Sequence, residues 1–240
     1  LIASLMQSQS SRPINTFTIG FEDKQFDEAS QARSVAIHLG TNHTELYLDT
    51  DDLMSVIPML PNIYSEPFAD SSQIPTFLIS KLARQNVTVA LSGDGGDELF
   101  GGYRRYYLTH KLWGILSNIP LPLRNLIKKF IFSLPPSTWD KFGNAVAVKR
   151  LGETLHKGAS LLHSQSAQDL YLSLISHWNE ETEVVLDTEP SSVLQQHTSE
   201  RFGGRNAIEK MMAQDMLNYL PNDILTKVDR ASMHTSLETR

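Results

Sequence analysis

Three carboxylates close to a glycine-rich turn are the side chains of this chain best suited to chemistry. They are Asp94, Asp97 and Glu98, in the run Ser92-Gly93-Asp94-Gly95-Gly96-Asp97-Glu98. Glycines leave backbone N–H groups open to a ligand, and together with a helix start they attract anions such as phosphate. Carboxylates on the same turn would repel a bare phosphate unless a divalent cation with oxygen ligands lay between them. The pattern therefore predicts a site for a metal-bound nucleotide.

A purely structural interpretation of this turn stays open at this point. Asp97 suits the N-cap of a helix and Glu98 its first turn, because both positions favour an acidic side chain. Glycines are also ordinary where a strand turns into a helix. The spacing matches neither G-x-G-x-x-G nor G-x-x-x-x-G-K-S/T, so neither the Rossmann nor the Walker fingerprint applies.

The elements before this turn alternate between strands and helices. The apolar run at residues 87–91 predicts a strand buried on both faces. Further strands are expected at residues 16–21 and 44–48, and helices at residues 27–39, 51–63 and 74–83, the second interrupted by Pro58 and Pro61. This alternation indicates a parallel sheet with ligands beyond the carboxyl ends of its strands. We therefore expect the turn after Ile19 and the Ser92 loop on one rim of the sheet.

Helices replace strands in the second half of the chain. The sequence predicts short helices at residues 108–134 and amphipathic helices at residues 170–178 and 207–220. One face of the last helix carries Ile208, Met211, Met212, Met216 and Tyr219, which is typical of core packing. We expect an α/β nucleotide-binding core at residues 1–106, a helical insertion at 107–204 and the start of a C-terminal helical block at 205–240.

The composition excludes several classes of function. The chain has 240 residues, of which 40% are hydrophobic and 20% charged, as in globular proteins. A formal charge of −6 argues against broad binding to nucleic acids or anionic membranes. The absence of cysteine removes disulfides, thiolate metal sites and cysteine nucleophiles, and it fits a reducing cytoplasm. No apolar run approaches the roughly 18 residues of a membrane span.

The glycine-rich turn resembles the signature of asparagine synthetases of the glutamine-hydrolysing type. The similar run extends from Ser92 to Tyr103 and reads S-G-D-G-G-D-E-L-F-G-G-Y. Further similarity lies in residues 17–21, 38–43, 66–76 and 220–240, the last with the runs L-P-N-D-I-L-T-K-V-D-R and S-L-E-T-R. The implied fold is α/β, a parallel sheet with flanking helices of the adenine-nucleotide alpha-hydrolase (PP-loop ATPase) type, with a helical insertion.

The resemblance implies an ATP-dependent ligase. The family's synthetase domain adenylates the side-chain carboxylate of L-aspartate, releases pyrophosphate, and lets ammonia attack the β-aspartyl-AMP. An N-terminal glutaminase domain of the same parent chain supplies that ammonia from glutamine. ATP and Mg²⁺ are the implied cofactors, the cytoplasm is the implied location, and a homodimer is compatible with this family.

The resemblance also implies roles for individual residues. The positions that match the family's nucleotide contacts are Ile19, Gly20, Ser92 and Gly93. Asp97 matches the carboxylate that holds magnesium. Asp94 matches a position, often Glu in the family, tied to formation of the intermediate and to proton handling, and Glu238 matches a carboxylate near it. For Glu238 the alternative is a salt bridge to Arg240 or Arg230. Lys227 and Arg230 either face a phosphate or stabilise the fold, and the sequence does not decide between the two.

Two family segments are missing from this sequence. The pyrophosphate loop S-G-G-x-D-S, together with the strand that carries it, should stand before Leu1, and the run P-F-L-D should follow Arg240. We therefore expect the chain to be a fragment of a longer enzyme and to be inactive alone.

Two other functions stay open. One is a related adenylating amide ligase with another carboxylate substrate, as in β-lactam synthetases or in sugar and peptide amidation, with Asp70 and the region near Glu238 shaping its pocket. The other is a non-catalytic scaffold. The intact Asp94 and Asp97 count against the scaffold, because a site that had drifted from catalysis has no physical reason to keep clustered carboxylates.

Overall fold

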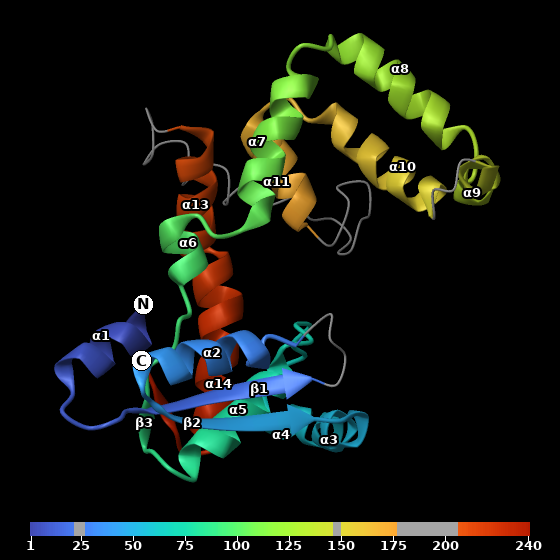
Figure 1. Ribbon diagram of the computed structural model, residues 1–240. Helices are drawn as coiled ribbons and strands as arrows, with labels where there is room; N and C mark the ends of the chain where they lie inside the picture. The colour runs from blue at the N-terminus through green and yellow to red at the C-terminus, as the bar shows by residue number, and fades with distance from the viewer. Residues whose placement is uncertain (22–26, 146–149, 177–205) are drawn as a thin grey trace. The chain divides into compact units, whose positions relative to one another are not determined.

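The computed structural model describes residues 1–21, 27–145, 150–176 and 206–240 (Figure 1). The chain forms two compact units. Unit 1 comprises Leu1–Gly95 and Asn218–Arg240, and unit 2 comprises Gly96–Leu217. The domain boundaries expected after residues 106 and 204 stay a prediction, and the second of them falls outside the described residues.

Two parallel strands and the helix between them open unit 1. The strands β1 (Asn15–Phe21) and β2 (Asn42–Leu48) lie side by side and pair in parallel (Figure 1). In this pairing Gly20 lies opposite Tyr47. Between them α2 (Ala29–Leu39) packs on both strands and ends at Gly40, which has a φ of 69°. A left-handed residue after the last turn is a common helix end, and glycine adopts it without strain. The two strands and the helix predicted for this region are confirmed.

A second, shorter sheet in unit 1 joins distant parts of the chain. In it β3 (Val89–Ala90) pairs in parallel with β4 (Glu238–Thr239). The predicted strand at residues 87–91, buried on both faces, is wrong in its length and burial: the strand covers only Val89 and Ala90, and the residues Val89 and Leu91 are 43% and 48% exposed. A strand paired over two residues has little around it to cover such side chains. Within the described part of the chain the sheets β1–β2 and β3–β4 are separate, and both are parallel.

Helices complete unit 1. They are α1 (Ile2–Gln9), α3 (Thr50–Val56), η1 (Ile57–Met59), α4 (Leu60–Ile63), α5 (Gln73–Arg84), the π-helical η3 (Leu220–Leu225) and α14 (Thr226–His234). The breaks at Pro58 and Pro61 and the helix over 74–83 are confirmed. The core of the unit lies where α5 packs against α14, and it contains Val56, Ile63, Tyr64, Phe77 and Ala231.

Unit 2 is helical throughout its described residues. Its helices are α6 (Gly96–Phe100), α7 (Arg104–Leu116), α8 (Leu121–Phe132), α9 (Pro136–Ala145), α10 (Leu151–Ser160), η2 (Leu161–His163), α11 (Ala167–Ile175) and α13 (Ala207–Leu217). Its core contains Tyr106, Tyr171 and Met211, with Ile208 and Met212 packed against them, so the predicted core face of α13 is confirmed for these residues. The predicted helix at 170–178 is confirmed up to Ile175; residues 177 and 178 lie outside the described ranges. In the described ranges, none of the helices has the length and apolar character that crossing a membrane requires.

Candidate active site

The pairing of β3 with β4 brings the last residues of the chain to the start of the glycine-rich turn. The backbone N–H of Glu238 donates to the carbonyl oxygen of Thr88 at 2.9 Å, and that of Arg240 donates to Ala90 at 3.0 Å. The N–H of Ser92 then donates to the carbonyl oxygen of Arg240 at 3.0 Å. Glu238 therefore lies on the strand next to the one that leads into the turn at Ser92, although the two are far apart in the sequence.

Glu238 is exposed and forms a salt bridge with Arg240, two residues further along the chain. Its Oε1 accepts a hydrogen bond from Nε of Arg240 at 2.7 Å and forms an ion pair with Nη2 of the same residue at 2.7 Å, and the two side chains are 52% and 69% exposed. This is the salt bridge that the sequence offered as the alternative to a catalytic role. An exposed pair of this kind contributes little free energy, so it leaves the carboxylate accessible to a ligand. The catalytic role of Glu238 stays a prediction.

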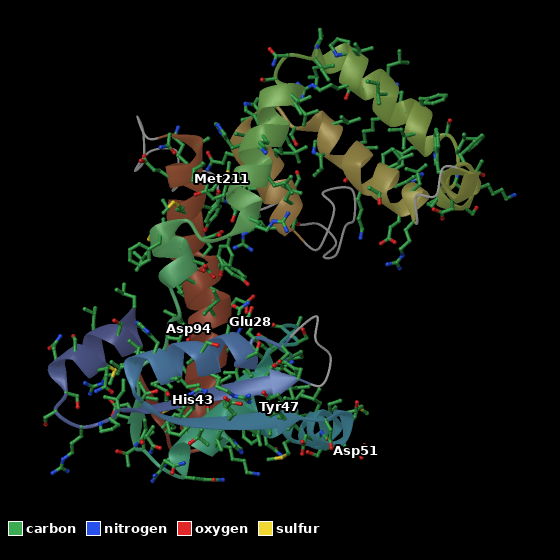
Figure 2. The ribbon with its side chains drawn as sticks, viewed as in Figure 1. Glu28, His43, Tyr47, Asp51, Asp94 and Met211 are labelled. Carbon is green, nitrogen blue, oxygen red and sulfur yellow. The ribbon has the colours of Figure 1, made fainter. Side chains whose placement is uncertain are left out.

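Asp94 lies on the turn itself. The turn connects β3 to α6, and the Asp94 side chain is exposed (Figure 2). The next residue, Gly95, has a φ of 84°, a conformation that an L-residue with a side chain rarely adopts. The left-handed backbone at position 95 therefore requires glycine. This requirement explains one glycine of the glycine-rich turn without any bound ligand.

Asp97 lies inside the short helix α6. The helix begins at Gly96, two residues earlier than an N-cap at Asp97 would place it, because the left-handed Gly95 turns the chain before it. The prediction of Asp97 as an N-cap is therefore wrong; the residue is in the first turn, with its side chain exposed.

The two glycines after α6 fold the chain back against Asp97. Gly101 has a φ of 68°, and the N–H of Gly102 donates to the carbonyl oxygen of Asp97 at 2.9 Å. A Cβ atom added to Gly102 would lie 2.0 Å from Oδ1 of Asp97. Only glycine at position 102 leaves room for the Asp97 carboxylate in this position.

Glu98 differs from the other two acids of the turn because it is buried. Its residue is 1% exposed, and Oε1 accepts a hydrogen bond from the hydroxyl of Tyr103 at 2.8 Å. Its second oxygen, Oε2, has no hydrogen-bond partner within the described ranges. Glu98 therefore belongs to the interior of unit 2, whereas Asp94 and Asp97 are open to solvent.

A buried carboxylate that the sequence analysis missed organises the core of unit 2. Oδ2 of Asp215 accepts hydrogen bonds from Arg105 Nη2 at 2.6 Å, Tyr106 OH at 2.7 Å and Tyr171 OH at 2.5 Å. Burial and the hydrogen bond to this carboxylate both raise the pKa of the two tyrosines, so both stay protonated donors. The available signal was an acidic residue four positions after Met211, on the buried face of α13.

A second partly buried ion pair ties the C-terminal block to the rest of unit 1. Lys227 Nζ lies 2.5 Å from Oδ2 of Asp70, and Asp70 also accepts from the N–H and the hydroxyl of Ser72 at 2.8 Å each. Burial alone would raise the pKa of Asp70, but these donors outweigh it and lower the pKa. Arg230 donates to the hydroxyl of Ser65 at 2.7 Å. Both contacts fit the alternative in which Lys227 and Arg230 stabilise the fold.

Gly20, a predicted nucleotide contact, has a structural reason to be glycine. A Cβ atom on it would lie 2.5 Å from Cε1 of Tyr47, the residue opposite it on β2 (Figure 2). Gly20 and Ile19 lie close to the carboxyl end of β1, as expected. Within the described ranges no hydrogen bond joins these two residues to the turn at residues 92–95, so their common rim stays a prediction.

Asp97 offers one exposed carboxylate near the turn to a metal ion. No group of three or more His, Cys, Asp or Glu side chains within the described ranges could hold a metal. Mg²⁺ keeps several waters and is usually bound through one or two carboxylates together with phosphates of the substrate. The exposed carboxylate of Asp97 meets that requirement without further protein ligands.

Comparison with known protein families shows the family to which this chain belongs. The asparagine synthase family model matches residues 1–240, the whole chain. The chain belongs to the asparagine synthase family. Domains of this family are α/β and of the PP-loop ATPase type, which confirms the fold class predicted from the sequence.

Proteins similar to this chain are named as asparagine synthetases. Asparagine synthetase (glutamine-hydrolyzing) 1 of Bacillus subtilis is 28% identical over 232 residues, which are 95% of this chain and 34% of that protein. A putative asparagine synthetase (glutamine-hydrolyzing) 2 of Methanocaldococcus jannaschii is 35% identical over 229 residues, 92% of this chain and 40% of that protein. Human asparagine synthetase (glutamine-hydrolyzing) matches 43% of this chain at 33% identity. The chain thus spans between a third and two fifths of the length of these two relatives.

Proposed function

We propose that this chain is part of the synthetase domain of an ATP-dependent carbon–nitrogen ligase that forms asparagine from L-aspartate. The observation that carries the proposal is the β3–β4 pairing, which brings Glu238 beside the turn that holds Asp94. Family membership over the whole chain and the names of the relatives support the same activity.

The proposed reaction has two steps. An oxygen of the aspartate side-chain carboxylate attacks the α-phosphorus of ATP, the bond to pyrophosphate breaks, and β-aspartyl-AMP forms. Ammonia then attacks the acyl carbon and loses a proton, and AMP leaves with the oxygen that came from the carboxylate. A carboxylate is a poor electrophile, so the first step supplies the leaving group that the second requires.

The glycine-rich turn and the end of β1 are the proposed nucleotide contacts. Ile19 and Gly20 would lie against the adenine. Ser92 already donates its N–H to Arg240, so we assign its contact with the nucleotide to its side chain and that of Gly93 to its backbone. Both residues follow β3 after Leu91, close to the carboxyl end of the strand, where ligands of parallel sheets gather.

Asp94 and Glu238 are the proposed catalytic acids. A carboxylate near the acyl carbon can accept the proton that ammonia loses, and a pair of carboxylates can share that work. Asp94 is exposed on the turn, and Glu238 is exposed on the adjacent strand, so both are accessible to substrate.

Asp97 is the proposed magnesium ligand. When bound there together with the phosphates, Mg²⁺ would offset the negative charge that collects on the leaving pyrophosphate. Asp97 would orient the ion through a carboxylate whose position depends on Gly102.

The proposal extends to partners that lie outside this chain. Ammonia would come from glutamine through an N-terminal glutaminase domain, since the relatives are named as glutamine-hydrolysing enzymes. A homodimer in the cytoplasm completes the proposal, and a sequence without cysteine suits that reducing compartment.

The test measures pyrophosphate release by a protein that extends this chain to the full length of its relatives, hereafter the extended protein. Mg-ATP and ammonia are supplied, and L-aspartate is compared with a panel of other carboxylic acids. We expect release with aspartate and its loss in Asp97→Ala. Release with another acid only would keep the adenylation chemistry and overturn the substrate. Folded protein that is silent with every acid would favour a scaffold.

A further inference from the structure

Asp215 connects three helices of unit 2 from a fully buried position. It belongs to α13, while its donors Arg105 and Tyr106 belong to α7 and Tyr171 belongs to α11. The carboxylate side chain is 0% exposed and that of Arg105 is 27% exposed. Moving Arg105 away from Asp215 would leave a buried charge without compensation, which costs free energy. The contact therefore holds the first turn of α7 in place against α13.

The contact continues from Arg105 to the helix that carries Asp97. The guanidinium carbon of Arg105 lies 4.0 Å from the centre of the Tyr103 ring, close enough for a cation–π interaction. The ring of Tyr103 also packs edge-on against Tyr106 at 5.6 Å, and its hydroxyl donates to Glu98 of α6. The position of Tyr103 is therefore set by residues that Asp215 holds.

Tyr103 in turn sets two neighbours of Asp97. It is bonded along the chain to Gly102, where an added Cβ would meet the Asp97 carboxylate, and through its hydroxyl it holds Glu98, the residue after Asp97. A shift of Tyr103 would move both contacts of Asp97 at once.

We propose that Asp215 is a positioning residue for Asp97, acting through Arg105 and Tyr103. It touches neither substrate nor metal; its charge keeps Arg105 over the Tyr103 ring and thereby keeps the Asp97 carboxylate in a fixed place. The inference rests on the proposed function for the role of Asp97 in magnesium binding. The hydrogen-bond and ring contacts that carry it lie within unit 2 and do not depend on that role.

The test compares Asp215→Asn with the unchanged extended protein in two measurements. The first is the magnesium concentration that gives half-maximal pyrophosphate release. We expect it to rise about tenfold, the lower end of the effect seen when a group that orients a metal ligand is lost, with the KM for aspartate at saturating magnesium unchanged. The second is hydrogen exchange of the Gly102 amide, which donates to Asp97 and should exchange faster in the variant.

Two further variants keep the test decisive. Tyr171→Phe removes one of the three donors to Asp215 without removing charge, so it should shift both measurements in the same direction by less, and it carries the test if Asp215→Asn does not fold. Glu153→Gln breaks the exposed ion pairs with Arg150 and Lys157 in the same unit and should change neither measurement.

The outcomes separate the inference from the proposed function. A folded Asp215→Asn or Tyr171→Phe protein with unchanged magnesium dependence and unchanged Gly102 exchange would overturn the positioning role. If Asp97→Ala itself leaves the magnesium dependence unchanged, the proposed magnesium role of Asp97 fails. Hydrogen exchange of the Gly102 amide then still shows whether Asp215 stabilises the backbone contact between Gly102 and Asp97.

Discussion

Ser92 donates its backbone N–H to the carbonyl oxygen of Arg240 at 3.0 Å, across 148 positions of the chain. This bond extends the two-residue pairing of β3 with β4 up to the first residue of the glycine-rich turn. It fixes the backbone of Ser92 and places Glu238 on the strand next to that turn. The candidate site is thus built from two segments that only the fold brings together.

Replacing Glu238 by Gln should separate catalysis from stability. Glu238 is half exposed and paired only with an exposed arginine in the described structure, so the free energy of unfolding should change by about 1 kcal/mol or less. Loss of a general base should slow asparagine formation about 100-fold or more. Urea unfolding and ammonia-dependent product formation in the extended protein measure the two effects. A stable variant with full activity would leave the salt bridge as the only role of Glu238.

Replacing Gly102 by Ala should displace the Asp97 carboxylate while leaving the fold in place. The added Cβ would lie 2.0 Å from Oδ1 of Asp97, and the mobile end of that side chain can move away. We expect pyrophosphate release to fall about 100-fold at low magnesium, because a metal ligand misplaced by about 1 Å costs that much rate.

Gly114→Ala provides the matched control for this variant. Gly114 lies inside α7, and an added Cβ there would meet no atom within 4 Å. Alanine in a helix interior should stabilise the protein by up to about 1 kcal/mol without changing the magnesium dependence. Equal loss of activity in both glycine variants would contradict the specific role of Gly102.

Removing Lys227 should destabilise unit 1 through the carboxylate that it leaves behind. The side chains of Lys227 and Asp70 are 11% and 21% exposed, so Lys227→Met should cost about 3 kcal/mol of unfolding free energy. If Lys227 contacted a phosphate instead, the variant would keep its stability and lose affinity for ATP. Urea unfolding and ATP titration distinguish the two results.

The same pair should make stability depend on pH in acid. The folded-state pKa of Asp70 lies below its ordinary value of 3.8, so its contribution to stability is complete above about pH 4 and is lost as the pH falls through the lower folded-state pKa. The stability difference between the natural protein and Asp70→Asn should therefore shrink below pH 4. Unfolding by urea at pH 7, 5, 4 and 3 measures it; a difference that stays constant over this range would contradict the assignment.

Gly20 and Tyr47 should behave as one packing unit. A Cβ on Gly20 would overlap the Tyr47 ring, so Gly20→Ala should lower the melting temperature, and adding Tyr47→Leu should restore much of it. A nucleotide contact at Gly20 would add a loss of ATP affinity that the second substitution does not repair. Thermal unfolding and ATP binding of the single and double variants separate these roles.

Local patterns predicted the elements well where one face of the chain is buried. The helix at residues 29–39 and the parallel strands beside it follow from apolar periodicity and from a glycine at the helix end. The short β3 was harder to predict, because its length depends on pairing with residues near position 238. The burial of a strand depends on the elements that pack around it. The sequence of residues 87–91 alone does not contain that information.

The sequence supplied the residue types of the candidate site, whose roles stay a prediction, but not the burial of each side chain. Asp94 and Asp97 are exposed as a ligand site requires, whereas Glu98 is buried by Tyr103 and its surroundings. The role of Asp215 could not be deduced because its donors come from helices about 40 and 110 residues earlier in the chain. Such contacts arise from tertiary packing, which a local pattern does not contain.

The most direct test of the central claim follows an isotope from substrate to product. The extended protein is given Mg-ATP, ammonia and L-aspartate labelled with ¹⁸O in its side-chain carboxylate, and the products are analysed by mass spectrometry. If the carboxylate is adenylated, each AMP carries one ¹⁸O atom and the pyrophosphate carries none. Labelled orthophosphate together with ADP, or AMP without label, would contradict adenylation of aspartate and with it the proposed function.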